Sequence, residues 1–402
     1  MSGGEVMIQL IAQQKSTGSV VTNDRHHGAR RMKRRIKPVY GALLLFLGGL
    51  LCAAFSQRST RCSTLMSEQA GEPFLSPREA NASPRTPLSV AIHRRHPGCE
   101  AFEGSKRVVG QIVRARTVRT QFNMHVYSKA RVKDIVSNTI EQAGAWEADD
   151  TEKLMSILSG DSVASAPEAA KTGVLVDVGA NIGWFTLVAL HLGHAVVAFE
   201  PFERNAELLC SSVQAVHNYK PRFRLVRLGL DHKERECELF QQMDVNIGDT
   251  HSVCDSETKK TFVEKNYQSL GWMNTTTLDD ALRSGTFSMI DRVDVMKIDV
   301  EGFEPSVFLG GNRFFQSSFA PRYLFVELVS ERMGEVQGLH DRGKHRLRSV
   351  LLALANYGYE IDEYSKEGKS DLELSASSLE QLESSLDGRT VLFRKAFNAS
   401  GN

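Results

Sequence analysis

The feature that most constrains this chain is a glycine-containing turn between a buried strand and a helix. The run Val-Leu-Val-Asp-Val, residues 174–178, is apolar with one acid, as expected of a central strand covered on both faces. The motif DVGANIG, residues 177–183, follows, and a helical pattern begins at once. Gly179 permits a turn that a side chain would block, and Gly183 lets the helix approach the strand. We expect the loop N–H groups and the helix N-terminus to face an anion.

Short apolar runs alternate with helical patterns from residue 174 onward, without an internal repeat. Such alternation predicts a mostly parallel sheet with right-handed crossovers. The expected fold class is α/β, a Rossmann-like arrangement of a mostly parallel seven-stranded sheet with helices on both faces. The expected strands are residues 174–178, 195–199, 223–229, 293–300, 323–328, 359–364 and 390–394. The expected helices are residues 182–192, 203–216, 278–282 and 345–357.

The next expected strand ends at Glu200, an acid placed to hydrogen-bond two ribose hydroxyls. The structural alternatives are that Gly183 only packs and that Glu200 only caps the following helix. The spacing D-x-G-x-x-x-G differs from the G-x-G-x-x-G of dinucleotide loops. The preceding acid, Asp177, fits a ligand that carries an ammonium group. S-adenosylmethionine has such a group and NAD does not, so we expect S-adenosylmethionine as cofactor.

Three blocks of sequence resemble the FkbM-type methyltransferase family. They are VDVGANIGWFTL from Val176, AFEPFERNAELL from Ala198, and a late block from Thr277 that contains VMKIDVEGFE, LGG and FVE. The resemblance spans about residues 175–395. It implies a class I methyltransferase fold and usually O-methylation, often of a sugar or polyketide hydroxyl. An apparently longer polar segment, residues 243–267, departs from the family pattern and leaves the substrate side open.

The resemblance also implies which residues hold S-adenosylmethionine. By position, the methionine part would lie against Asp177, Gly179, Asn181 and Gly183, the ribose against Glu200, and the adenine near Leu230 and Asp231.

The candidates for chemistry follow the fourth and fifth expected strands. Transfer to a hydroxyl needs alignment and benefits from a base. Alternation places Lys297, Asp299 and Glu301 on one face, with Glu304 beyond them, and Glu327 ends the next strand. We expect Asp299 or Glu301 to be the base, positioned by Lys297. The alternatives are a structural ion pair from Lys297 to Asp299 or Glu327, and a divalent metal held by Asp299, Glu301 and Glu327; the leading expectation contains no metal.

Other residues could serve the same site. His232, His251 and His340 are alternative bases, although a lone histidine in a polar loop is more often solvated. We also expect the loop of residues 246–252 to close over the site.

A membrane anchor is expected near the N-terminus. Residues 30–37 read RRMKRRIK, and residues 39–55 form an uncharged apolar run at the lower length limit for a bilayer span. The positive-inside bias places the N-terminus in the cytosol and the rest across the membrane. A cleaved signal peptide is the rival interpretation. Residues 56–105, rich in Ser, Pro, Arg and Glu, are typical of a stalk.

The expected organisation is therefore a basic cytoplasmic tail (1–38), a transmembrane signal-anchor (39–55), a linker (56–105), an N-terminal cover of the catalytic domain (106–171) and a methyltransferase domain (172–397). This predicts a single-pass type II protein of the Golgi or endoplasmic reticulum with a lumenal catalytic domain. Sequons at Asn81, Asn274 and Asn398 give slight support.

Composition excludes some functions. The net charge is +1, and no basic stripe with interleaved aromatics occurs in the catalytic part, so we expect no nucleic acid partner. No CxxC pair occurs among the six cysteines, which argues against a cysteine metal site. Cys62 and Cys99 could pair or remain free thiols, and Cys210 is expected in the core. We expect a hydroxyl-bearing acceptor, possibly a glycan; the rivals are a non-catalytic nucleotide-binding module and an NAD-dependent sugar-modifying enzyme.

Overall fold

The computed structural model describes residues 98–102, 110–130, 133–160, 172–242, 246–247, 250–335, 343–363, 374–375 and 378–396. Two compact units divide at residue 80, and every described residue belongs to the second. The expected cytoplasmic tail, the segment 39–55 and most of the linker lie outside the described residues. Within the described ranges, no helix has the length and apolar character to cross a membrane. The signal-anchor therefore stays a prediction.

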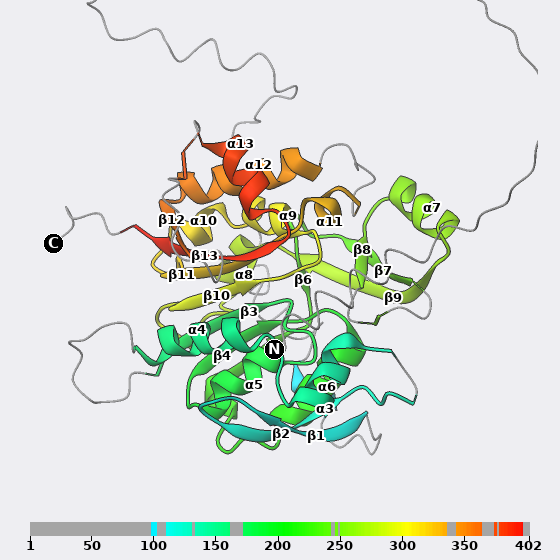
Figure 1. Ribbon diagram of the computed structural model, residues 1–402, viewed down its shortest axis with the longest axis vertical. Coiled ribbons are helices and arrows are strands. Elements are labelled where there is room, and N and C mark those ends of the chain that lie inside the picture. Colours follow the sequence, from blue (N-terminus) through cyan, green and yellow to red (C-terminus); the bar gives the residue numbers. More distant parts are fainter. Residues whose placement is uncertain are drawn as a thin grey trace, which may run out of the picture. The chain divides into compact units, whose positions relative to one another are not determined.

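A seven-stranded sheet in the order β12-β13-β11-β10-β3-β4-β5 forms the centre of the described unit (Figure 1). All neighbours pair in parallel except β13, which runs antiparallel to both β11 and β12. This confirms the predicted α/β fold with a mostly parallel seven-stranded sheet. The strands are β3 (Val174–Val178), β4 (Ala195–Phe199), β5 (Phe223–Val226), β10 (Val295–Ile298), β11 (Tyr323–Leu328), β12 (Tyr359–Glu363) and β13 (Arg389–Lys395).

Helices bury both faces of this sheet because its strands are apolar on both sides. In β3, Leu175 belongs to one hydrophobic cluster, whereas Val176 and Val178 belong to the other. The first cluster includes α5 (Trp184–His191) and α6 (Glu203–Val213). The second includes residues of α8 (Leu278–Arg283), α9 (Glu304–Leu309), α10 (Asn312–Phe315), α11 (Ser330–Glu335), α12 (Gly343–Asn356) and α13 (Leu379–Leu386).

A second sheet, in the order β6-β9-β7-β8, is formed within residues 229–276, and the polar segment 243–267 contributes β8 and α7 to this region. The predicted strand 223–229 is divided, since β5 ends at Val226 and β6 joins this other sheet. A small core of Phe240, Val253 and Phe262 holds the second sheet together. Its elements are β6 (Gly229–Leu230), β7 (Glu236–Gln242), β8 (His251–Val253), α7 (Ser256–Glu264) and β9 (Tyr267–Thr276), and a 3-10 turn, η2 (Lys220–Arg222), precedes β5.

The segment before the main sheet packs on its helices. It comprises η1 (Cys99–Phe102), β1 (Gln111–Arg116), β2 (Gln121–Val126), α3 (Ile135–Ala143) and α4 (Ala148–Ser159). The β1–β2 hairpin lies on α6, where the His125 N–H donates to Ser212 Oγ at 2.8 Å. The Trp184 indole N–H of α5 donates to Thr151 Oγ1 of α4 at 2.8 Å. The segment therefore covers the helices beside the glycine loop.

Two disulfides cross-link the described unit. Cys99 bonds to Cys210, and Cys237 bonds to Cys254. The suggested pairing of Cys99 with Cys62 is therefore wrong in this structure, because Cys99 lies against α6 and its sulfur is taken by Cys210. Cys210 is buried as expected, but it is a bonded cysteine rather than a free core thiol. The Cys99–Cys210 bond ties the chain before the hairpin to the first hydrophobic cluster.

Candidate active site

The glycine loop after β3 lies directly against the end of β10. Gly179 has φ +83°, a backbone conformation that favours glycine, and a Cβ there would come within 1.8 Å of the Asp299 carbonyl oxygen. Gly183 has φ +94°, and a Cβ there would lie 2.1 Å from Leu209 Cδ1. Both glycines thus allow close packing, as the sequence predicted for Gly183. The loop and the acidic end of β10 form one site.

The backbone N–H groups of this loop have partners within the protein. Gly179 and Ala180 both donate to the Phe199 carbonyl at 3.0 Å, and Gly183 donates to the Ala180 carbonyl at 2.9 Å. Asn181 donates to Glu200 Oε2, and Ile182 to Asn181 Oδ1, each at 2.8 Å. The expectation that the loop N–H groups face an anion is therefore wrong for residues 179–183. A phosphate or diphosphate would find none of these five donors available.

Asp177 joins the glycine loop to the helix that follows it. Its carboxylate is almost wholly buried, and Oδ2 accepts a hydrogen bond from Thr186 Oγ1 at 2.6 Å. Burial raises the pKa of Asp177, while the nearby charge of Lys297 and the bonds from Thr186 oppose that shift. Asp177 therefore fixes the first turn of α5 through its hydrogen bond with Thr186.

Glu200, at the end of β4, is held by two backbone donors. Its Oε2 accepts from the Asn181 N–H and its Oε1 from the Phe202 N–H, both at 2.8 Å. The side chain is buried, and burial raises the pKa of Glu200 to about 8 against the opposing effect of these bonds. Carboxylate oxygens retain further lone pairs for hydroxyl donors. The structure thus places Glu200, the residue predicted to bind the ribose, in contact with the glycine loop.

Leu230 and Asp231, the predicted adenine neighbours, are buried in the connection to the second sheet. Leu230 belongs to the second hydrophobic cluster. The carboxylate of Asp231 accepts from Arg235 Nε at 2.6 Å and lies 2.7 Å from His232 Nδ1. Both carboxylate oxygens of Asp231 thus have partners within the protein. A contact of Leu230 or Asp231 with the cofactor stays a prediction.

At the end of β10, Lys297 forms the ion pair that the sequence suggested. Its Nζ lies 2.6 Å from Asp299 Oδ2 and 4.9 Å from the centre of the Phe185 ring. The ammonium is buried, and although burial alone would lower its pKa, the carboxylates of Asp299, Glu147 and Asp177 raise it. Burial would likewise raise the pKa of Asp299, but the charge of Lys297 holds it below its usual value. Asp299 is thus ionised beside an ionised lysine.

Glu327 and Glu301 complete the cluster from neighbouring elements. Glu327 hydrogen-bonds to Asp299, and burial followed by the charge of Asp299 raises the pKa of Glu327 to about 8. Arg332 contacts both Glu301 and Glu327, the latter at 3.0 Å. The strand ends at Ile298, and Glu301 lies in a turn with φ 53°. The prediction that strand alternation places Glu301 beside Lys297 is therefore wrong.

Glu147 is a site residue that the sequence reasoning missed. It precedes α4 with φ 41°, outside the conformations usual for glutamate. Burial raises its pKa to about 7, and Lys297 and Asp299 are its strongest charged neighbours. Nothing in the sequence marks Glu147, because it falls within a weakly helical stretch where acids normally face solvent. The cover segment thus contributes a carboxyl group to the cluster.

Glu304, by contrast, has a local structural role. Its Oε1 accepts from the Val300 N–H at 3.0 Å, and burial raises its pKa to about 7. This bond closes the turn that carries Glu301. The carboxyl group of Glu304 therefore shapes the end of β10.

The alternative bases have other neighbours or lie outside the described chain. His232 contacts Asp231, and His251 is buried between the rings of Phe262 and Tyr267 in the second sheet. His340 and part of the expected closing loop are outside the described residues. Among the described residues, one group meets a simple metal-ligand spacing, Asp231 with Cys237 and Cys254, and its two sulfurs are joined as a disulfide.

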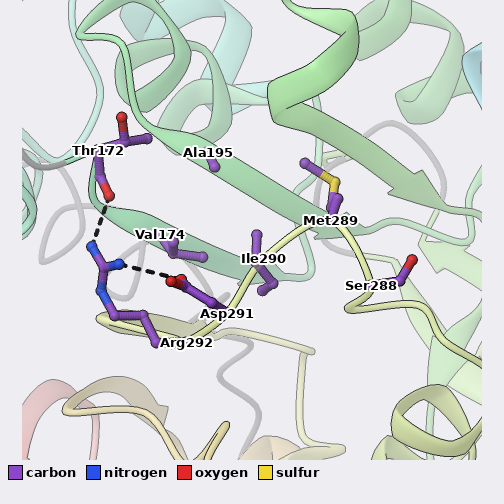
Figure 2. A pocket seen from close by; sticks show the side chains of 8 residues that line it. All are labelled: Thr172, Val174, Ala195, Ser288, Met289, Ile290, Asp291 and Arg292. Carbon is purple, nitrogen blue, oxygen red and sulfur yellow. Dashed lines mark hydrogen bonds and ion pairs between the residues drawn. The ribbon is translucent and has the colours of Figure 1, made fainter.

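A shallow pocket of about 550 Å³ lies at the opposite, amino ends of β3 and β4 (Figure 2). Thr172, Val174 and Ala195 line one side. Arg292 closes the other side through contacts with Asp291 and the Thr172 carbonyl. Ligands of open α/β sheets bind at the carboxyl ends of the strands. This pocket is therefore not the site of the loop and the acidic cluster.

The site fits a ligand with cationic groups and adjacent hydroxyls. Burial raises the pKa of Asp177 and Glu200, and a bound cation would favour their ionised forms. Glu200 offers hydroxyl acceptors, and the loop donors are occupied. S-adenosylmethionine carries an ammonium, a sulfonium and a ribose diol, and it has no phosphate. These residues therefore fit S-adenosylmethionine, and they fit a dinucleotide diphosphate poorly.

Comparison with known proteins agrees with this geometry. Residues 177–361 match the methyltransferase FkbM domain. No curated protein matches the chain in sequence.

Solved structures give distant likenesses. The methyltransferase FkbM from Methylobacillus flagellatus is 16% identical with a TM-score of 0.31, and the match covers 56% of this chain and 43% of that one. Magnesium protoporphyrin IX methyltransferase from Synechocystis, with bound S-adenosylmethionine, is 10% identical with a TM-score of 0.32, covering 79% and 100%. Pyrococcus abyssi tRNA (uracil-54, C5)-methyltransferase is 12% identical with a TM-score of 0.30, covering 72% and 47%. At these similarities the structures carry no argument about substrate.

Proposed function

We propose that the chain is an S-adenosylmethionine-dependent methyltransferase, because residues 177–361 match the methyltransferase FkbM domain, and that it methylates a hydroxyl group of a glycan or a related small molecule. The observation that carries this proposal is the contact between the glycine loop and the end of β10. Gly179 abuts the Asp299 backbone so closely that no Cβ fits between them. The cofactor loop and a set of proton acceptors therefore lie side by side.

In this proposal the acid pair Asp299–Glu327 takes the proton of the acceptor hydroxyl. The cofactor supplies a methyl group on a sulfonium, which is already activated for in-line transfer. About a quarter of each side chain, 27% for Asp299 and 26% for Glu327, is exposed and can reach a substrate. The pair shares one proton at neutral pH because two adjacent carboxylates resist ionising together. When Glu327 loses its proton, the pair can accept one from the hydroxyl.

Lys297 and Glu147 hold this pair in place. The buried ammonium of Lys297 contacts Asp299 directly and keeps it ionised. Glu147 adds a second carboxyl group against Lys297 from the cover segment. Asp177 and Glu200 orient the glycine loop through Thr186 and Asn181. Each of these groups positions the cofactor or the base.

A dinucleotide-dependent reaction is disfavoured by the hydrogen bonds of the loop. A diphosphate is normally bound by free N–H groups of the glycine turn, and residues 179–183 donate to Phe199, Glu200 and each other. A purely binding module would not need an acid pair with one raised pKa beside the loop.

We further propose the topology expected from the sequence. Residues 39–55 anchor the chain, and the described unit lies in the lumen of the Golgi or endoplasmic reticulum. The two disulfides support this placement, because such bonds form and persist in oxidising compartments. Protection of the C-terminus from protease in sealed vesicles is the expected result, and cleavage without detergent would contradict it.

The test of the function is methyl transfer from radiolabelled S-adenosylmethionine to a panel of glycans by the full-length protein in detergent. We expect a product that gains one methyl group and resists alkali, as an ether does and an ester does not. A D299N variant serves as the inactive control. Cofactor binding with no labelled acceptor across cell-derived glycans and small molecules would favour the non-catalytic alternative.

A further inference from the structure

An exposed tryptophan and an exposed asparagine share one face of β9. Trp272 is 63% exposed and Asn274 is also exposed, whereas Met273 between them is buried. Side chains two apart in a strand point to the same side. The Trp272 ring therefore lies beside the Asn274 amide on the outer face of the second sheet.

We propose that Asn274 carries an N-linked glycan whose first sugar packs on the Trp272 ring. Asn274-Thr275-Thr276 has the N-x-T form that the transferase of the secretory pathway requires. The proposal rests on the lumenal placement proposed above, and it is independent of the methyl transfer reaction.

The folded structure leaves room for the glycan. Asn274 pairs in the sheet with Glu236, which is also exposed, so this end of the face is uncovered among the described residues. No described residue hydrogen-bonds to the Asn274 side chain, so attachment of a sugar breaks no contact seen in the fold. The glycan is added to the extended chain before folding, and the folded domain then accommodates it.

Trp272 supplies an apolar surface that the fold itself does not bury. Lys259 Nζ lies 5.2 Å from the ring centre and also pairs with Glu238 beneath it. Trp272 is the largest of the exposed hydrophobic side chains among the described residues, so covering its ring would remove a large apolar area from water. The C–H face of an N-acetylglucosamine linked two residues away would cover the ring.

The hydroxyl of Thr276, the last residue of the sequon, also supports the proposal. Thr276 is buried, and its Oγ1 has no hydrogen-bond partner among the described residues. A buried hydroxyl without a partner is unfavourable for folding, and valine would fill the same volume without that penalty. The sequon, however, requires a hydroxyl at this position.

The reaction is a substitution at the anomeric carbon of a polyprenyl-diphosphate-linked oligosaccharide. The C1–O bond to the diphosphate breaks, a C1–N bond to the Asn274 amide forms, the amide loses one proton, and the polyprenyl diphosphate leaves. No oxidant or reductant is involved.

The first experiment measures occupancy of the site in the full-length protein from eukaryotic cells. Trypsin releases residues 266–283 as one peptide that contains Asn274 and no other sequon. We expect this peptide to carry a single N-acetylhexosamine after endoglycosidase H treatment of a high-mannose preparation. The modification should disappear in N274Q and in T276V and persist in T276S, which keeps the hydroxyl.

The second experiment tests the ring contact. Removal of the glycan by N274Q should lower the Tm by about 2 °C when Trp272 is present and by less in the W272A background. Equal shifts in the two backgrounds would overturn the packing of the sugar on Trp272.

Protease protection of the same vesicles separates the two ways in which the first experiment can fail. An unmodified 266–283 peptide from protease-protected protein would overturn the glycan and leave the lumenal placement intact. An unmodified peptide from protease-sensitive protein would overturn the glycan and the lumenal placement together. Methyl transfer is measured separately and depends on neither outcome.

Discussion

Lys297 Nζ lies 2.6 Å from Asp299 Oδ2, and this ion pair sets the protonation of the site. Because the lysine keeps Asp299 ionised, the shared proton of the acid pair resides on Glu327, whose pKa rises to about 8. A buried charge pair is unfavourable unless its geometry and hydrogen bonds are good. Here the pair contacts the glycine loop, which links the electrostatics of β10 to the cofactor.

Replacement of Asp299 by asparagine removes the ionised half of the acid pair. We expect methyl transfer to fall about 100-fold, the lower range for loss of a general base. Affinity for S-adenosylmethionine should change less than the rate, since Asp177 and Glu200 remain. The matched control is D291N, because Asp291 is 83% exposed at the opposite end of the sheet. A D299N rate equal to that of D291N would remove Asp299 from the mechanism.

The rate of methyl transfer should increase with pH through the pKa of Glu327. Deprotonated Glu327 leaves the pair able to accept a proton, and the deprotonated fraction grows as pH rises through about 8. A pH–rate profile from pH 6 to about 9.5 measures this midpoint. E327Q should flatten the rise, whereas E331Q, on the exposed side of α11, should keep it. A wild-type profile that is flat over this range would contradict the role of Glu327.

The carboxyl group of Glu147, in the segment before the main sheet, should shift the midpoint of this pH–rate profile. Its negative charge opposes ionisation of the carboxyl groups near Lys297, so E147Q should move the midpoint to lower pH by a few tenths of a unit. The control is E152Q in α4, the helix that Glu147 precedes, where Glu152 pairs with Arg119. An unchanged midpoint in E147Q would show that Glu147 serves only to begin α4.

The Cys237–Cys254 disulfide should stabilise the second sheet. It closes a loop of 17 residues, for which the chain-entropy account gives about 3 kcal/mol. The double variant C237S/C254S should lower the free energy of unfolding by about that amount in denaturant titration. A loss below about 0.5 kcal/mol would mean that the bond does not constrain the unfolded chain.

The sequence predicted the main sheet because each strand is a compact apolar run with its own turn signals. It also placed Asp177, Gly179 and Glu200 correctly at the ends of β3 and β4, and Gly183 correctly at the start of α5. These features are local, since a strand, a turn and the next strand lie close together along the chain.

What the sequence missed depends on contacts between distant segments. The Phe199 carbonyl accepts hydrogen bonds from the Gly179 and Ala180 N–H groups, so these groups are not available to the expected anion. The pairing of Cys99 with Cys210 and the approach of Glu147 to Lys297 depend on how the cover segment packs. The second sheet arises from antiparallel pairing of β7 with β9, for which the polar sequence between them gave no signal.

The most direct test of the account is calorimetric titration of S-adenosylmethionine into the full-length protein in detergent. Glu200 accepts from the Asn181 N–H of the loop and is the predicted ribose ligand, so E200Q should weaken binding at least tenfold through loss of a hydroxyl acceptor. E203Q is the matched control, since Glu203 is 74% exposed in α6. Micromolar binding that is lost in E200Q and kept in E203Q is the predicted result. A folded wild-type protein that does not bind S-adenosylmethionine would contradict the account.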